Sequence, residues 1–273
     1  MPPFFPPPDA ALAYLFTGAL AGFFAGLLGV GGGVIVVPVL SILFTWQGFP
    51  AREVLHLALG TSMATILFTS LSSLRAHHAH QAVLWPVVGR LTPGILAGTL
   101  LGAQLAAQIS SRSLSIFFAC FMLFIAVQMI ANFRPKPSRN LPGSTGLSAA
   151  GLVIGGVASL AAMGGGALTV PYLIWCNVRP HLAIGTSAAV GLPIALGGTL
   201  GYVWNGWSHA DLPTGSLGFV YLPGLAVILL ASTVTAPLGA RTAHRLPIEV
   251  LKRVFAGLLL VLSAKMLWSL YGR

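Results

Sequence analysis

The sequence predicts an all-α polytopic membrane protein made of two homologous repeats. Composition gives the first reason: 56% of the 273 residues are hydrophobic and only 7% are charged, whereas soluble domains carry about 25% charged residues. The second reason is that apolar runs of membrane-spanning length recur along the chain. The third is internal similarity, because glycine, proline and hydroxyl landmarks recur in the same order in both halves.

The few charged residues are mostly basic. The formal net charge is +10, from 14 Lys and Arg against 4 Asp and Glu. In a soluble protein this charge would suggest nucleic-acid binding. Here the basic residues lie mostly between apolar runs, as they do in cytoplasmic loops that face anionic lipid. We therefore expect the lipid bilayer as a partner, and no nucleic acid.

Ten apolar segments are the expected helices. Six of them are long enough to cross a membrane alone. The other four form two pairs, and each pair is broken by glycines, at Gly29-Val30-Gly31-Gly32-Gly33 and at Met163-Gly164-Gly165-Gly166. Clustered glycines leave the helical conformation at low steric cost, so each pair is expected to be a kinked or re-entrant hairpin. The segments are 11–28, 33–45, 54–74, 83–107, 114–133, 146–162, 167–176, 182–204, 217–240 and 250–271.

The internal similarity defines the expected domains. A Pro-rich tail at 1–10, which lacks the basic residues of a signal peptide, precedes a first repeat at 11–133. A polar linker at 134–145 leads to a second repeat at 146–273. The matching landmarks are Gly31-Gly32-Gly33 and Pro38 with Gly164-Gly165-Gly166 and Pro171, and His56 and Gly60-Thr61-Ser62 with His181 and Gly185-Thr186-Ser187.

The basic residues also predict the path of the chain. If each glycine-broken pair returns to the side from which it started, nine basic residues face one side and three face the other. If each pair crosses once, the split is seven to five, which fits the positive-inside rule less well. The first arrangement gives five segments per repeat, so the second repeat is inverted, and it places both termini outside. The nine are Arg75, Arg134, Lys136, Arg139, Arg179, Arg241, Arg245, Lys252 and Arg253, and the three are Arg52, Arg112 and Arg273.

The glycine breaks are the candidate binding site. A short helix is expected to begin after each break, near Val34 and near Ala167, and a helix start has unpaired N–H groups that bind an anion without a charged side chain. An inverted pair would bring the two starts together near the membrane midplane. The alternative is that the glycines only allow close helix packing, although packing alone need not repeat three glycines and a proline in both halves. The expected substrate ligands are Gly31, Gly32, Gly33, Gly164, Gly165 and Gly166, with the hydroxyls of Thr61, Ser62, Thr186 and Ser187.

Both glycine breaks resemble a known family motif. The segment from Gly26 to Pro38 and its second copy from Gly164 to Pro171 resemble the opening motif of the TauE/SafE sulfite exporter family, and the Gly-Thr-Ser elements look like that family too. The resemblance covers nearly the whole chain. It implies a bacterial inner-membrane protein that moves sulfite, an organosulfonate such as sulfoacetate, or a related small compound. One departure is Met163, which stands where a small residue is expected before the second glycine run.

Ionisable residues give weaker candidates. Arg90 lies inside an apolar segment and is expected either to contact substrate or to extend to the membrane surface. Lys265 is the other internal cation, and we favour the surface for it. His56 and His181 are equivalent by repeat and could carry protons, although a place at a helix end is the favoured alternative.

The leading hypothesis is a secondary transporter for a small anion, because inverted repeats with broken helices are a recurring transporter plan. The alternatives are a small-anion channel and a non-transporting membrane subunit of a complex. An intramembrane enzyme is disfavoured, because the sequence has no Walker-A motif, nucleophile elbow or zinc pattern. We expect no metal and no cofactor, and the question of a homo-oligomer stays open.

Overall fold

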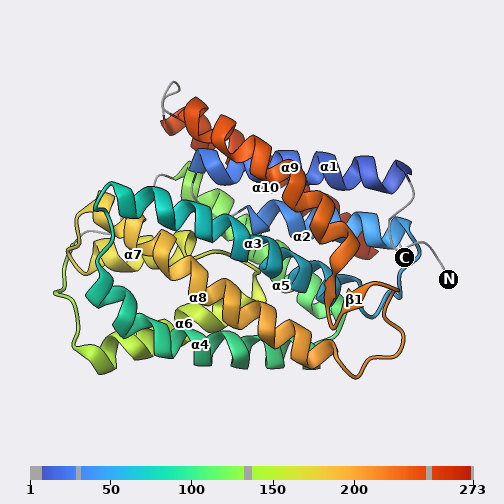
Figure 1. Ribbon diagram of the computed structural model, residues 1–273, viewed down its shortest axis with the longest axis horizontal. Helices are drawn as coiled ribbons and strands as arrows, with labels where there is room; N and C mark the ends of the chain where they lie inside the picture. The colour runs from blue at the N-terminus through green and yellow to red at the C-terminus, as the bar shows by residue number, and fades with distance from the viewer. Residues whose placement is uncertain (1–7, 29–31, 132–136, 244–247, 272–273) are drawn as a thin grey trace.

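A computed structural model describes residues 8–28, 32–131, 137–243 and 248–271. Within these ranges the chain forms ten helices and one short hairpin, so the all-α prediction is confirmed (Figure 1). The helices run along the long axis of the molecule. They are α1 (Pro8–Leu28), α2 (Gly33–Trp46), α3 (Val54–Ala79), α4 (Trp85–Gln108), α5 (Ser111–Ile130), α6 (Ser144–Leu160), α7 (Gly166–Trp175), α8 (Pro180–Gly206), α9 (Leu222–Ala243) and α10 (Ile248–Tyr271).

Helix ends carry ordinary stop and start signals. Proline opens α4 and α8, where its missing N–H costs nothing. Ser110 caps α5 by accepting a hydrogen bond from the Ser113 N–H. Asn177, just after α7, has φ 64°, in the left-handed region that Asn tolerates.

The expected segment 217–240 is not helical throughout. Its beginning forms strand β1 (Ser216–Leu217) and strand β2 (Val220–Tyr221), paired antiparallel, and α9 starts only after them. The turn between the strands contains Gly218, whose φ of 53° lies in the region that favours glycine. A turn of this kind reverses the chain before the helix can begin.

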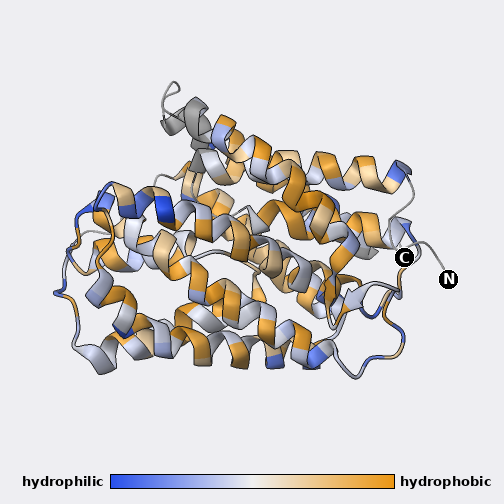
Figure 2. Ribbon diagram, in the orientation of Figure 1, coloured by the Kyte–Doolittle hydropathy of each residue, from blue (hydrophilic) through white to orange (hydrophobic). Residues whose placement is uncertain are grey.

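The surface of the helix bundle is suited to lipid. Among the described residues, five helical stretches are long and apolar enough to cross a membrane: Pro8–Gly26, Val54–Ala79, Ser111–Ile130, Pro180–Gly206 and Leu222–Gly239. Large apolar side chains such as Phe16, Phe124 and Leu230 are exposed on these helices. Figure 2 shows polar residues gathered at the two ends of the bundle and hydrophobic residues between them.

Tryptophans mark both ends of the bundle. All six are exposed, and each lies at or near the end of a helix. Tryptophan is enriched at membrane–water interfaces, where its amphipathic ring lies among the lipid headgroups. The six residues are Trp46, Trp85, Trp175, Trp204, Trp207 and Trp268.

Each glycine-broken pair returns to the end from which it started. The Gln47 Nε2 amide, just after α2, donates to the Tyr14 hydroxyl near the start of α1 at 2.7 Å. In the second pair, the N–H groups of Ser138 and Arg139, which precede α6, donate to the Trp175 carbonyl at the end of α7. Both pairs are therefore hairpins. This path agrees with the charge argument for five segments per repeat, and the inverted relation of the repeats stays a prediction.

Helices from the two expected repeats pack in alternation. α4 of the first packs closely along α6 of the second, and α1 of the first along α9 of the second. Glycines allow the helices of both pairs to come this close. A Cβ at Gly94 would collide with the Ser148 carbonyl, and a Cβ at Gly26 would collide with the Ala236 carbonyl. Small residues of this kind let membrane helices approach closely. The pair α3 and α8 lies between these two packed pairs.

Candidate functional site

The first glycine break ends at the start of α2. Gly32 is the N-cap residue, with φ 68°, and no side chain caps the helix. A Cβ at Gly32 would lie 2.9 Å from the Ala21 carbonyl oxygen, so both its conformation and its surroundings require glycine. Gly33 is the first helical residue and is buried. Gly31 lies outside the described residues.

The second glycine break lies between α6 and α7. Gly165 is the N-cap of α7, again without a side-chain cap, and its φ is −56°, so the two breaks differ in backbone conformation. Ala162, earlier in the loop, has φ 42°, a left-handed conformation that costs about 1–2 kcal/mol for a residue with a Cβ. Gly164 is buried, and Gly166 opens the helix half-buried.

The two breaks contact each other. A Cβ at Gly33 would collide with the Ala162 carbonyl oxygen and would lie 2.7 Å from Cδ1 of Ile66 on α3. The Ser62 hydroxyl, also on α3, donates to the Gly33 carbonyl at 3.4 Å. The starts of α2 and α7, which belong to different repeats, therefore lie on either side of a close backbone contact in the interior.

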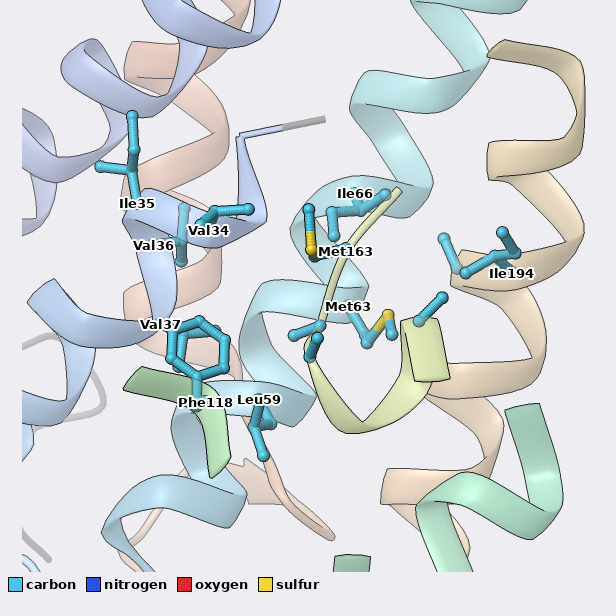
Figure 3. Packing of buried hydrophobic residues seen from close by; sticks show 14 of the residues in the cluster. Val34, Ile35, Val36, Val37, Leu59, Met63, Ile66, Phe118, Met163 and Ile194 are labelled. Atoms are coloured by element: carbon cyan, nitrogen blue, oxygen red, sulfur yellow. The ribbon is translucent and has the colours of Figure 1, made fainter. Parts of the chain in front are cut away.

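Hydrophobic side chains close the space around this contact. Met163 is 1% exposed and lies near Ile66 and the first turn of α2 (Figure 3). Val34, which belongs to the first turn of α2, and Met63 on α3 line the same region (Figure 3). In this conformation packed side chains surround the described residues of both breaks.

Two of the four expected hydroxyls cap helix starts. The Thr61 oxygen accepts from the Tyr221 N–H at 2.9 Å, just before α9, and the Thr186 oxygen accepts from the Leu84 N–H at 3.0 Å, just before α4. Each threonine therefore accepts a hydrogen bond from a backbone N–H just before a helix of the other repeat.

The side chain of Tyr221 lies in the same buried region. Burial raises the pKa of its phenol, so this side chain stays neutral.

Ser187 differs from the other three expected hydroxyls. Its side-chain oxygen has no hydrogen-bond partner among the described residues, and the residue is 1% exposed. A Cβ at Gly165 would lie 3.3 Å from this oxygen, so the hydroxyl lies beside the start of α7. An unpartnered buried hydroxyl costs about 1–3 kcal/mol, which a ligand would recover.

Sequence reasoning missed two further hydroxyls of the same kind. Thr169, on the first turn of α7, and Ser159, on the last turn of α6, are fully buried, and their side-chain oxygens have no partner in the described part of the chain. Thr169 aligns with Val36 in the first copy of the motif. A threonine in the second copy where the first copy has a valine was the sequence signal that could have indicated Thr169.

The ionisable candidates lie in different surroundings. His56 is buried, with Nδ1 3.2 Å from the Arg52 carbonyl oxygen and Nε2 3.0 Å from the Ala106 carbonyl oxygen. A Glu53 carboxylate oxygen is 3.8 Å from Nδ1. By contrast, the side chains of His181 and Arg90 are exposed, whereas Gly33 and Gly165 at the two breaks are buried.

The residues that the structure describes contain no group of three or more His, Cys, Asp or Glu able to hold a metal ion. What they do contain is a bundle of apolar helices with a lipid-suited surface and two enclosed helix breaks. These features define a polytopic membrane protein with non-helical backbone inside its bundle, an arrangement tolerated only where protein buries it or water reaches it.

The chain belongs to the sulfite exporter TauE/SafE family, whose model matches residues 14–266. A relative from Haemophilus influenzae, named "Probable membrane transporter protein", is 34% identical over 93% of this chain and 97% of its own length. The Bacillus subtilis protein named "Probable membrane transporter protein YdhB" is 29% identical over 89% of this chain and 96% of its own. No solved structure matches the chain.

Proposed function

We propose that the protein is a secondary transporter that moves a small anion, sulfite or an organosulfonate such as sulfoacetate, across the bacterial inner membrane. The observation that carries the proposal is the unpartnered buried hydroxyl of Ser187 beside the start of α7. The Ser187 hydroxyl can donate its hydrogen to an incoming oxyanion, as can the free N–H groups at a helix start, and none of these donors needs a counter-charge.

The position of this site suits a transporter. The two breaks lie in contact at the ends of two hairpins that enter from opposite ends of the bundle. Secondary transporters place their substrate site near the midplane at the interface of two repeats, and relative motion of the repeats opens it to either side. The sulfur preference rests on the family, several relatives of which are named as probable membrane transporters.

The orientation follows from charge. Arg75, Arg139 and Arg179 lie at the end of the bundle where α7 ends, and Arg52 and Arg112 lie at the other end, where α1 begins. By the positive-inside rule the first end is cytoplasmic, which places both termini in the periplasm. A reporter enzyme active only in the periplasm, fused to the C-terminus, tests this orientation.

Flux into proteoliposomes tests the function. Wild-type protein should take up sulfite or sulfoacetate at a rate that saturates with concentration, whereas a channel would give unitary currents and no saturation. Gly165→Leu should abolish uptake, because its Cβ alone would lie 2.6 Å from the Ser187 carbonyl oxygen. Gly89→Leu is the matched control, since a Cβ at Gly89 meets no atom within 4 Å. Absence of flux for every sulfur oxyanion in wild-type protein would contradict the proposal.

A further inference from the structure

A cavity of about 370 Å³ opens at the end of the bundle where α2 and α10 end and α3 and α5 begin. Its size is that of a small-molecule site. Its deepest extension along α2 reaches Pro38, five residues after Gly33, or about 8 Å of helix rise from the first glycine break. The cavity therefore leads from the bundle end toward the candidate site.

The lining of this cavity is cationic and rich in hydroxyls. Arg112 on α5 and Lys265 on α10 both line it, and the lining residues include no carboxylate. Among the described residues, neither cation has an acidic side chain within 4.0 Å. Two like charges gathered in a partly enclosed cavity attract anions, because low-dielectric walls focus their field. Hydroxyls come from Ser41, Thr45, Ser111, Ser115 and Ser269.

The start of α5 adds to this field. Ser111 and Arg112 belong to its first turn, where the helix dipole places partial positive charge. Hydrogen bonds also fix the wall: the Ser111 hydroxyl oxygen accepts from the Leu55 N–H at 3.2 Å, and the Ser115 hydroxyl donates to the Ser111 carbonyl at 2.7 Å. The cavity is therefore held by α3 and α5 together, with Lys265 facing it from the other repeat.

We propose that this Arg112–Lys265 pocket binds an oxyanion and forms the outer vestibule of the site at the glycine breaks. That the bound anion is the transported one rests on the proposed function, and binding itself does not. The same chemistry would accept either a free small oxyanion or the phosphate of an anionic lipid headgroup. Lys265, assigned to the membrane surface from sequence, is then a ligand of this pocket.

Protection of Lys265 from acetylation tests the pocket without any flux measurement. The chain has only three lysines, Lys136, Lys252 and Lys265, so mass spectrometry can follow each one. In phosphatidylcholine nanodiscs, sodium sulfate at constant ionic strength should slow acetylation of Lys265 at least threefold and leave the other two unchanged. Arg112→Gln should remove the protection. Arg52→Gln, an equal charge change at the same end but outside the cavity lining, should keep it.

A second set of nanodiscs identifies the source of the anion. If phosphatidylglycerol protects Lys265 without sulfate and Arg112→Gln removes that protection, the pocket binds a lipid phosphate. If neither sulfate nor phosphatidylglycerol protects Lys265, the pocket is not an anion site. Protection of Lys265 without flux in proteoliposomes would overturn the proposed function and support the anion pocket. Flux without protection would support the proposed function and overturn the pocket.

Discussion

Alanine at position 187 would remove a single hydroxyl that is buried beside the second glycine break. In the described structure this oxygen makes no hydrogen bond, so its removal breaks none. A buried, unsatisfied hydroxyl costs about 1–3 kcal/mol. Ser187→Ala should therefore leave the free energy of unfolding unchanged or raise it by up to about that amount.

Binding should respond in the opposite direction. A hydrogen bond to a charged partner contributes about 1.5–3 kcal/mol, and each 1.4 kcal/mol is tenfold in affinity. If the Ser187 hydroxyl donates to the anion, Ser187→Ala should weaken binding roughly 10- to 150-fold. Calorimetric titration of the detergent-solubilised protein with sulfite, sulfate and sulfoacetate measures this change, and thermal unfolding of the same sample measures stability.

The neighbouring residue provides the control. Thr186→Val removes the oxygen that accepts from the Leu84 N–H at 3.0 Å, so it should lower stability by about 1–3 kcal/mol and leave the affinity of the folded protein unchanged. An affinity for Ser187→Ala within threefold of wild type, for every anion that binds, would refute the role assigned to this hydroxyl.

Three further predictions concern stability, measured by thermal unfolding in detergent. Thr61→Val should cost about 1–3 kcal/mol, because the buried N–H that donates to Thr61 at 2.9 Å loses its acceptor; an unchanged melting temperature would contradict the capping role. Gly33→Ala should destabilise, since its Cβ would collide with a backbone carbonyl of the second break, whereas Gly89→Ala, with no atom within 4 Å, should stabilise by about 0.5–1 kcal/mol. His56→Ala should cost at least about 2 kcal/mol by breaking a buried network, whereas exposed His181→Ala should change stability by about 0.5 kcal/mol or less; equal effects would show that burial does not distinguish the two histidines.

The helices were predictable because both the apolar runs and the glycine clusters that break them are visible in the sequence. Each of the ten expected segments overlaps one helix of the structure, and the two glycine clusters separate α1 from α2 and α6 from α7. The hairpin at residues 216–221 was not predictable in this way, because its residues are as apolar as those of a helix start. The turn depends on backbone conformations at Gly215 and Gly218, which an apolar average does not register.

The candidate site was predictable in residue type and less so in role. Thr61 and Ser187 belong to equivalent Gly-Thr-Ser elements, yet the Thr61 hydroxyl oxygen accepts from a backbone N–H and the Ser187 oxygen has no protein partner in the described structure. The partner of Thr61 lies 160 residues further along the chain, so no local pattern indicates it. The position of Arg112 in a cavity likewise depends on how the ends of four helices meet.

The two threonine caps also constrain how the protein is made. The Leu84 N–H is paired by a residue 102 positions later, and Thr61 meets a residue 160 positions later. A ribosome therefore delivers α3 and α4 to the membrane long before their permanent partners exist. Until then water, lipid headgroups or, for the threonine hydroxyls, a carbonyl of their own helix must satisfy these polar groups, because hydrocarbon offers no substitute. The first half of the chain thus stays incompletely folded until α9 has been inserted.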